Sequence, residues 1–259
     1  MCLIAFAWNA HPRYRLIVGA NRDEWHDRPS APAAWWNDHP QILAGRDLNA
    51  GGSWMGVTRH GRFAAVTNFR DPTDKRLSAR SRGELVSNFL SGDATPEIFL
   101  SVTKRRSHEY NGFNLIVGDT SSLAYFNSRR REIEVLSQGV YALSNHTLNE
   151  PWPKVTTAKS ALEDVLRAEM SEKARQMAIC AFLSDETIAQ DAVLPDTGVG
   201  IEWERRLSSA LIVSPKYGTR ASTILSVAKN GGVSFEEHTR MNDGRVSHVA
   251  TFNFELAPN

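Results

Sequence analysis

Short apolar segments bounded by turn residues recur along this chain, in groups that are separated by helical patterns. In the last such segment, 247–256, apolar residues fall on alternate positions, which is typical of a β-strand with one buried face: Ala250, Phe252, Phe254 and Leu256. The same reasoning predicts strands at 2–8, 14–20, 113–118, 123–127, 132–136, 139–145, 210–214, 219–228 and 232–240, and a hairpin across 53–69.

Apolar residues at helical spacing predict a helix at 155–166. Thr95 as N-cap, Pro96 in the first turn and basic residues at the end predict another at 95–106. Helices are also expected at 81–90 and 174–185. Strands that follow one another through short turns pair antiparallel, and helices segregated from them indicate an α+β layered fold rather than a doubly wound α/β fold. The Pro- and Trp-rich segment 28–40 is predicted to be a loop. Because no internal repeat or linker-like stretch is present, a single domain over 1–259 is expected.

Charge and cysteine content exclude several classes of function. The formal net charge of +1 gives no field that would attract nucleic acid or anionic lipid. No apolar run approaches the roughly 20 residues of a transmembrane segment, and no basic residues of a signal peptide precede the first strand. Two cysteines are too few for a disulfide framework, which favours a reducing compartment and a cytoplasmic location. The eight histidines are dispersed, so no metal site is predicted.

A cysteine stands directly after the initiator methionine, at the start of the first predicted strand. A thiol is a good nucleophile as the thiolate, and a terminal α-amine with a pKa near ~8 is a base that would lie beside it. Small residues after Met1 generally permit its removal, so Cys2 is a candidate nucleophile. The alternative is a buried strand residue, as free cysteines often are.

A polar run, Asn21-Arg22-Asp23-Glu24, follows the apolar strand 14–20. Because a short turn joins this strand to 2–8, the two are expected to pair antiparallel and to return the chain to the level of Cys2. Asp23 or Asn21 would then reach the terminal amine. The alternative is a solvated strand end.

Asn68 and Asn145 stand at the ends of predicted strands, where a side-chain amide can donate to an oxyanion. Arg220 stands just inside another strand. Turn capping is the alternative for the asparagines, and an ordinary surface position is the alternative for Arg220. Cys180, inside the helix predicted at 174–185, is expected to be a small core residue.

These features together resemble the NRDE family, which is named after the tetrapeptide at 21–24 and is also called the transport and Golgi organization family. The resemblance runs through MCLIAF, LIVGANRDEW, AGRDLNAGGSWMG, FAAVTNFRDP, GFNLIVGD, YALSN, PWPKV and YGTRAST. It implies a relation to the N-terminal-nucleophile hydrolases of the choloylglycine hydrolase group, with a four-layer αββα fold of antiparallel sheets. The catalytic residues implied are Cys2 as nucleophile, Asp23 at its amine, Asn68 and Asn145 at the oxyanion and substrate, and Arg220 near the thiol.

The resemblance implies two functions for a small-molecule site. One is hydrolysis of a non-peptide amide or thioester, although those hydrolases carry an arginine just before their Asn-x-Asp, where this chain has Ala20. The other is binding or trafficking of haem or acyl-CoA in the same cavity, in which case haem is a ligand and no cofactor is required. The residues expected to contact the ligand are Asn21, Arg22, Glu24, Arg46 and Trp54. Nothing in the sequence indicates an oligomeric state.

Overall fold

In the computed structural model, which describes residues 2–73, 76 and 78–258, the strands form two antiparallel sheets. Each sheet is the centre of one compact unit. Unit 1 contains the residues up to Asp27 together with Gln138–Asn253, and unit 2 contains Arg28–Ser137 and the residues from Phe254 onward. Unit 1 is therefore built from two segments that are distant in the sequence.

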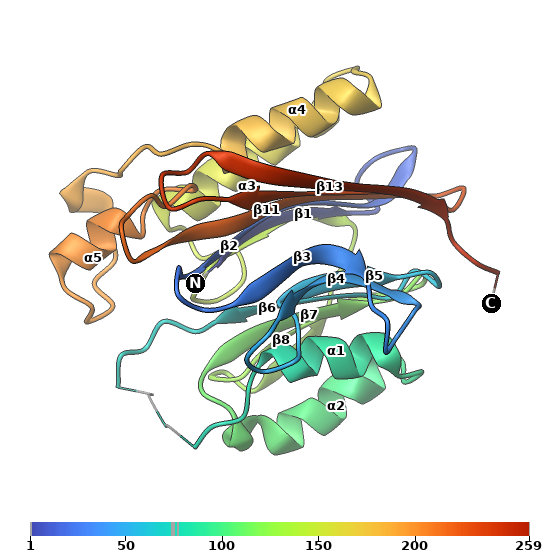
Figure 1. Cartoon of the computed structure of the whole chain (residues 1–259), viewed down its shortest axis with the longest axis horizontal. Coiled ribbons are helices and arrows are strands. Elements are labelled where there is room, and N and C mark those ends of the chain that lie inside the picture. The colour runs from blue at the N-terminus through green and yellow to red at the C-terminus, as the bar shows by residue number, and fades with distance from the viewer. Residues whose placement is uncertain (1, 74–75, 77, 259) are drawn as a thin grey trace. The chain divides into compact units, whose positions relative to one another are not determined.

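The sheet of unit 1 has the strand order β10-β1-β2-β11-β12-β13. Helices α3 (Pro153–Arg167) and α4 (Glu172–Leu183) pack on one of its faces (Figure 1), α3 against β1 and β10, and α4 against β2 and β11. The core under these helices includes the fully buried Leu3, Leu162 and Ile179. The strands are β1 (Cys2–Trp8), β2 (Tyr14–Trp25), β10 (Gly139–Leu143), β11 (Tyr217–Ala228), β12 (Gly232–Arg240) and β13 (Val246–Glu255). Two short helices, η2 (Asp191–Val193) and α5 (Ile201–Arg206), lie between α4 and β11 in the chain.

The sheet of unit 2 runs in sequence order from β3 to β9. Helices α1 (Gly83–Ser91) and α2 (Pro96–Arg106) pack on it (Figure 1), over a core that includes Phe89, Leu100 and Phe126. The strands are β3 (Ser30–Trp35), β4 (Ile42–Asp47), β5 (Met55–Thr58), β6 (Phe63–Asn68), β7 (Phe113–Gly118), β8 (Leu123–Asn127) and β9 (Glu132–Val135). The turn η1 (Ser107–Glu109) follows α2. Among the described residues, no helix combines the length and the apolar composition that crossing a membrane requires.

Helix α2 begins where its sequence predicts. The side chain of Thr95 accepts a hydrogen bond from the backbone N–H of Ile98, and Pro96 occupies the first turn, where its missing N–H costs nothing. Lys104 and the two arginines after it end the helix, where positive charge suits the helix dipole. Local signals of this kind are the reason that this helix is predictable from the sequence alone.

The α+β class, with helices segregated from antiparallel sheets, is confirmed. Each unit is one layer of helices on one sheet, which is half of an αββα arrangement. The single domain over 1–259 stays a prediction.

The predicted loop at 28–40 is wrong, because it contains β3. This strand lies at the edge of its sheet, and its pairing with β4 is irregular between Ala31 and Ala34. An edge position and an irregular register are the two conditions under which a strand tolerates proline, here Pro32.

Two further local predictions are wrong. The polar run 21–24 does not follow the strand but is part of β2, which pairs with β1 on one side and with β11 on the other. The segment 210–214 is not a strand, because its backbone bonds individually to Asp185 and Thr219 instead of forming a ladder.

Candidate functional site

Cys2 lies at the start of β1, directly opposite Arg22 of β2. The core under α3 and α4 contains Leu3, Ala5 and Ala7, so the alternation of strand side chains places Cys2 and Arg22 together on the other face of the sheet. Both are nearly buried, with exposed fractions of 9% for Cys2 and 5% for Arg22. The antiparallel pairing expected for these two strands is confirmed, and it brings the polar run of β2 to the level of Cys2.

The surroundings of Cys2 hold its thiol in the neutral form. Burial raises the pKa of Cys2 above its ordinary value, and the charge of Asp23 also raises it. A hydrogen bond from the backbone N–H of Asp23 and the positive charge of Arg22 act in the opposite direction. The site therefore needs a base to remove the thiol proton, and it holds groups that favour the thiolate once the proton has left.

Asp23 is fixed in place by Thr219, its partner on β11. The hydroxyl of Thr219 donates to Oδ1 of Asp23 at 2.7 Å and accepts from the backbone N–H of Ile212 at 2.9 Å. Asp23 is only 1% exposed. It comes one residue past Arg22, the partner of Cys2, so it lies at the amino end of Cys2. A carboxylate in that position can hold an amine there.

Asn145 lies two residues beyond β10, the strand that pairs with β1 on the side away from β2. Between them, the hydroxyl of Ser144 donates to the carbonyl oxygen of Cys2 at 2.9 Å and also lies 3.1 Å from Oδ1 of Asn145. Asn145 is fully buried. Ser144 therefore couples the position of this amide to the backbone of Cys2.

Arg220 is the extra residue of a bulge in β11, where the pairing with β2 skips one position. Its guanidinium donates to the carbonyl oxygens of Trp25 at 2.9 Å and His26 at 3.1 Å. Burial lowers the pKa of Arg220, and the charge of Arg22 lowers it further. Two guanidinium groups thus concentrate positive charge near the end of β2.

Asn21 and Glu24 have other surroundings. Nδ2 of Asn21 donates to the carbonyl oxygens of Leu183 and Ala210, both at 2.8 Å, so this side chain connects β2 to the last residue of α4 and to the segment after α5. A carboxylate oxygen of Glu24 lies 4.0 Å from the guanidinium of Arg22. Asn21 is therefore an anchor of the strand, whereas Glu24 belongs to the charged end of the site.

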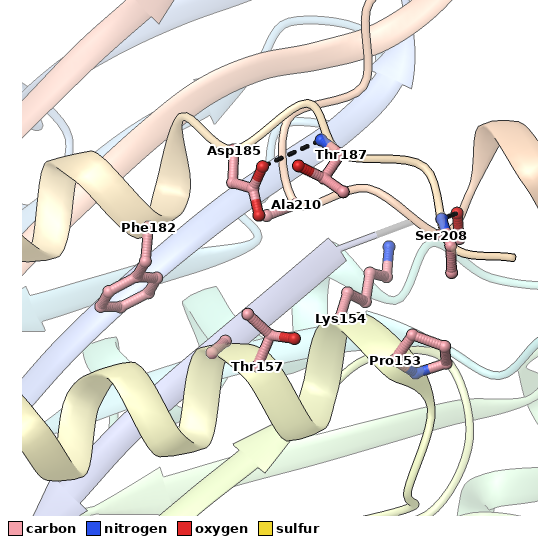
Figure 2. Close-up of a pocket in the computed structure, with 10 residues that line it drawn as sticks. Pro153, Lys154, Thr157, Phe182, Asp185, Thr187, Ser208 and Ala210 are labelled. Atoms are coloured by element: carbon pink, nitrogen blue, oxygen red, sulfur yellow. Dashed lines mark hydrogen bonds between the residues drawn. The ribbon is translucent and has the colours of Figure 1, made fainter. Parts of the chain in front are cut away.

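A cavity of about 190 Å³ lies beside the helices of unit 1 (Figure 2). Lys154, only 4% exposed, extends from α3 toward the part of the wall that contains Thr187 and Ser208. Ala210, whose carbonyl oxygen accepts from Asn21, is also in the wall. The cavity is on the helix side of the sheet, whereas the thiol of Cys2 is on the other side. A group attacked by Cys2 would therefore not lie in it.

Asn68, Arg46 and Trp54 lie in unit 2. Asn68 is the last residue of β6, as its position in the sequence predicted. The guanidinium of Arg46 forms a two-pronged ion pair with Asp38 at 2.6 and 2.8 Å. The ring of Trp54 fills the space that a Cβ atom on Gly45 would occupy. The roles of these three residues at the oxyanion or in ligand binding stay predictions.

Two residues that the sequence did not single out, Ser144 and Thr219, support the site. Each directly precedes a candidate residue, Asn145 or Arg220. Serine and threonine are common in and near strands, so only the long-range pairing of the strands reveals them. Within the described part of the chain, no group of three or more His, Cys, Asp or Glu is placed to hold a metal ion.

The sequence of this chain is similar to those of known proteins. A family model described as Transport and Golgi organisation 2 matches residues 1–242. Two relatives described as Transport and Golgi organization protein 2 homolog, from Bos taurus and Homo sapiens, are 37% and 35% identical, and each match covers 99% of both chains. Among solved structures, a Caenorhabditis elegans N-acylethanolamine-hydrolyzing acid amidase ortholog is similar with a TM-score of 0.47 and 13% identity, over 86% of this chain and 92% of that one.

Proposed function

This chain belongs to the Transport and Golgi organisation 2 family, as its motifs predicted, and we propose that it hydrolyses a non-peptide amide or thioester bond with Cys2 as the nucleophile. Family membership alone assigns no reaction, so the proposal rests on one geometric observation. The pairing of β1 with β2 and β10 gathers Arg22, Asp23 and Asn145 around the end of the strand that carries Cys2. These are the kinds of group that acyl transfer to a thiol requires.

In the proposed reaction the mature chain starts at Cys2, whose α-amine accepts the thiol proton while Sγ bonds to the carbonyl carbon of the substrate. Asp23 holds the amine in position, and Nδ2 of Asn145 donates to the oxyanion. When the intermediate collapses, the C–N or C–S bond breaks, and the leaving amine or thiol takes the proton from the ammonium group. Water then attacks the thioester on Cys2, with the same amine as base, and releases the carboxylic acid.

The family resemblance adds roles for two more residues, and the state of the cysteines adds a location. Arg220 adds to the positive charge that favours the thiolate. Asn68 would be a second donor to the oxyanion. We also infer a cytoplasmic location, because both cysteines, Cys2 and Cys180, are free thiols.

A second function, binding or trafficking of an anionic hydrophobic ligand such as haem or acyl-CoA, has one observation in its favour. Arg22 is nearly buried and lies opposite Cys2, on the face of the sheet away from α3 and α4. A guanidinium group in this setting suits the carboxylates of haem or the phosphates of acyl-CoA. Arg46 suits this role less, because Asp38 already engages its guanidinium.

The two functions are separated by turnover and binding assays on the same variants. Acyl-CoA thioesters and N-acyl amides are offered to the wild-type protein, to Cys2→Ala and to Cys180→Ala as the matched thiol control. Hydrolysis is expected to be lost in Cys2→Ala and retained in Cys180→Ala. Equal turnover by Cys2→Ala and the wild type would refute the nucleophile. Absence of turnover, with binding of haem or acyl-CoA that Arg22→Ala abolishes, would favour the carrier.

A further inference from the structure

A second nucleophilic cluster lies in unit 1, where α4 packs on the sheet (Figure 1). Cys180 of α4 is at the edge of the core, as its position predicted, but it is only half-buried. Its Sγ lies 3.7 Å from Nδ1 of His238 on β12, and Nε2 of the same ring lies 2.7 Å from a carboxylate oxygen of Glu236. A thiol, an imidazole and a carboxylate are thus connected in series. This is the arrangement in which the imidazole is the base that activates the thiol and the carboxylate orients the imidazole.

The charges around this cluster favour a thiolate and an imidazolium. The hydrogen bond with His238 lowers the pKa of Cys180, and a hydrogen bond with Ser184 and the charge of Arg240 act in the same direction against the effect of burial. The contact with Cys180 in turn raises the pKa of His238, as does the hydrogen bond with Glu236.

Arg240 is itself held in place. Its guanidinium donates to the hydroxyls of Ser222 and Ser184, each at 2.8 Å. Ser184, which also acts to lower the pKa of Cys180, thus connects Arg240 to the C-terminal end of α4. His238, Arg240 and Ser184 therefore all favour the thiolate of Cys180. The acidic groups that balance these charges are Glu186 near Arg240 and Glu236 on His238.

The two cysteines of the chain differ in the pKa of the thiol and in its access to solvent. Burial raises the pKa of Cys2, whereas a cationic partner lowers the pKa of Cys180. Cys2 is 9% exposed and faces away from α3 and α4, whereas Cys180 lies on α4 and is half-buried. A small oxidant is therefore expected to react faster with Cys180 than with Cys2, because the fraction of thiolate and the access to the sulfur control the rate of oxidation.

We propose that Cys180 is an oxidation site, at which a hydroperoxide converts the thiolate to a sulfenic acid. Sγ attacks the terminal peroxide oxygen, so an S–O bond forms and the O–O bond breaks. The sulfur loses two electrons and the hydroperoxide gains them. His238 passes its proton to the leaving oxygen, which departs as water or an alcohol and leaves a neutral imidazole.

The oxidised state is expected to be a sulfenic acid rather than an internal disulfide. The chain contains two cysteines, and Cys2 and Cys180 lie on opposite sides of the sheet of unit 1. A disulfide needs Cα atoms within about 7 Å, which that placement prevents in the folded protein. A small external thiol would therefore be the agent that restores Cys180.

The test uses the wild-type protein, because Cys2 is an internal control. The protein is treated with hydrogen peroxide at neutral pH in the presence of dimedone, which traps sulfenic acids, and labelling of the two cysteine-containing peptides is measured by mass spectrometry. We expect rapid labelling of Cys180 and little of Cys2. Labelling of both at the same rate, or of Cys2 alone, would overturn the proposal.

Two variants test the assigned mechanism. His238→Gln removes the imidazolium and should slow labelling of Cys180 by about tenfold for each unit by which the pKa of the thiol rises. The pH at which iodoacetamide alkylates Cys180 at half its maximal rate should rise in parallel. His248→Gln, an exposed position on β13, is the matched control and should behave as the wild type.

Glu236→Gln gives a second measurement if His238→Gln does not fold, and it should raise the same half-maximal pH by a smaller amount. Thermal unfolding checks that each variant is folded. If both His238→Gln and Glu236→Gln are folded and label as fast as the wild type, the cluster does not activate Cys180 and the proposal fails.

Discussion

Replacing Asn21 by alanine tests whether this residue is an anchor of the fold or a ligand contact. Asn21 is 1% exposed, and its Nδ2 donates to the carbonyl oxygens of Leu183 and Ala210, both at 2.8 Å. The substitution removes two hydrogen bonds and leaves two acceptors at a buried site. With a cost of about 1–2 kcal/mol for each lost bond and its unsatisfied partner, the free energy of unfolding should fall by about 2–4 kcal/mol.

Urea denaturation of the full chain measures this change directly. For a chain of this size a loss of that magnitude corresponds to a decrease in Tm of about 5–15 °C. Asn242→Ala, in the exposed turn after β12, is the matched control and should change the stability by less than about 0.5 kcal/mol.

A refuting result would be an Asn21→Ala variant as stable as the control variant. Loss of turnover or of ligand binding in such a fully stable variant would show that Asn21 contacts the ligand, as the family resemblance implied. The anchor role derived from its two carbonyl partners would then be wrong.

Three further predictions concern Cys2, Asp23 and the packing of unit 2. Because burial raises the pKa of Cys2, its alkylation should be slower at neutral pH than that of a free thiol. For the same reason Cys2 should stabilise the folded state fully below pH 9, and this stabilisation should be lost as the pH rises above that value. A free energy of unfolding that increases in this alkaline range would contradict the direction of the shift. Thr219→Val removes the donor to Asp23 and should lower both Tm and kcat, whereas Thr219→Ser should retain them, so equal loss in both variants would argue against a positioning role. Gly45→Ala places a Cβ 2.0 Å from the ring of Trp54, so the free energy of unfolding measured in urea should fall by about 1–3 kcal/mol. Adding Trp54→Leu to this variant should partly restore the lost stability.

Local signals in the sequence were sufficient for part of this structure. The cap at Thr95 and the short turn between 2–8 and 14–20 specify α2 and the β1–β2 pairing from neighbouring residues. That pairing alone brings Asp23 to the amino end of Cys2. The candidate site could therefore be located, in outline, from the first 25 residues.

The rest depends on contacts between residues that are far apart in the sequence. Four polar residues in a row normally indicate exposure, yet Asn21 and Asp23 are buried, and residues beyond 180 supply the hydrogen-bond partners of Nδ2 of Asn21 and Oδ1 of Asp23. The bulge at Arg220 and the contact between Cys180 and His238 also arise from strand pairing and helix packing that no local pattern specifies.

The central claim is that Cys2 acts with its own α-amine, and the mass of the intact purified protein tests it most directly. If the claim is correct, the main species has the mass of the chain without Met1, and incubation with a slowly hydrolysed acyl substrate adds one acyl group to Cys2 in the wild type and none in Cys2→Ala. A main species that retains Met1 and gains no acyl group would contradict it.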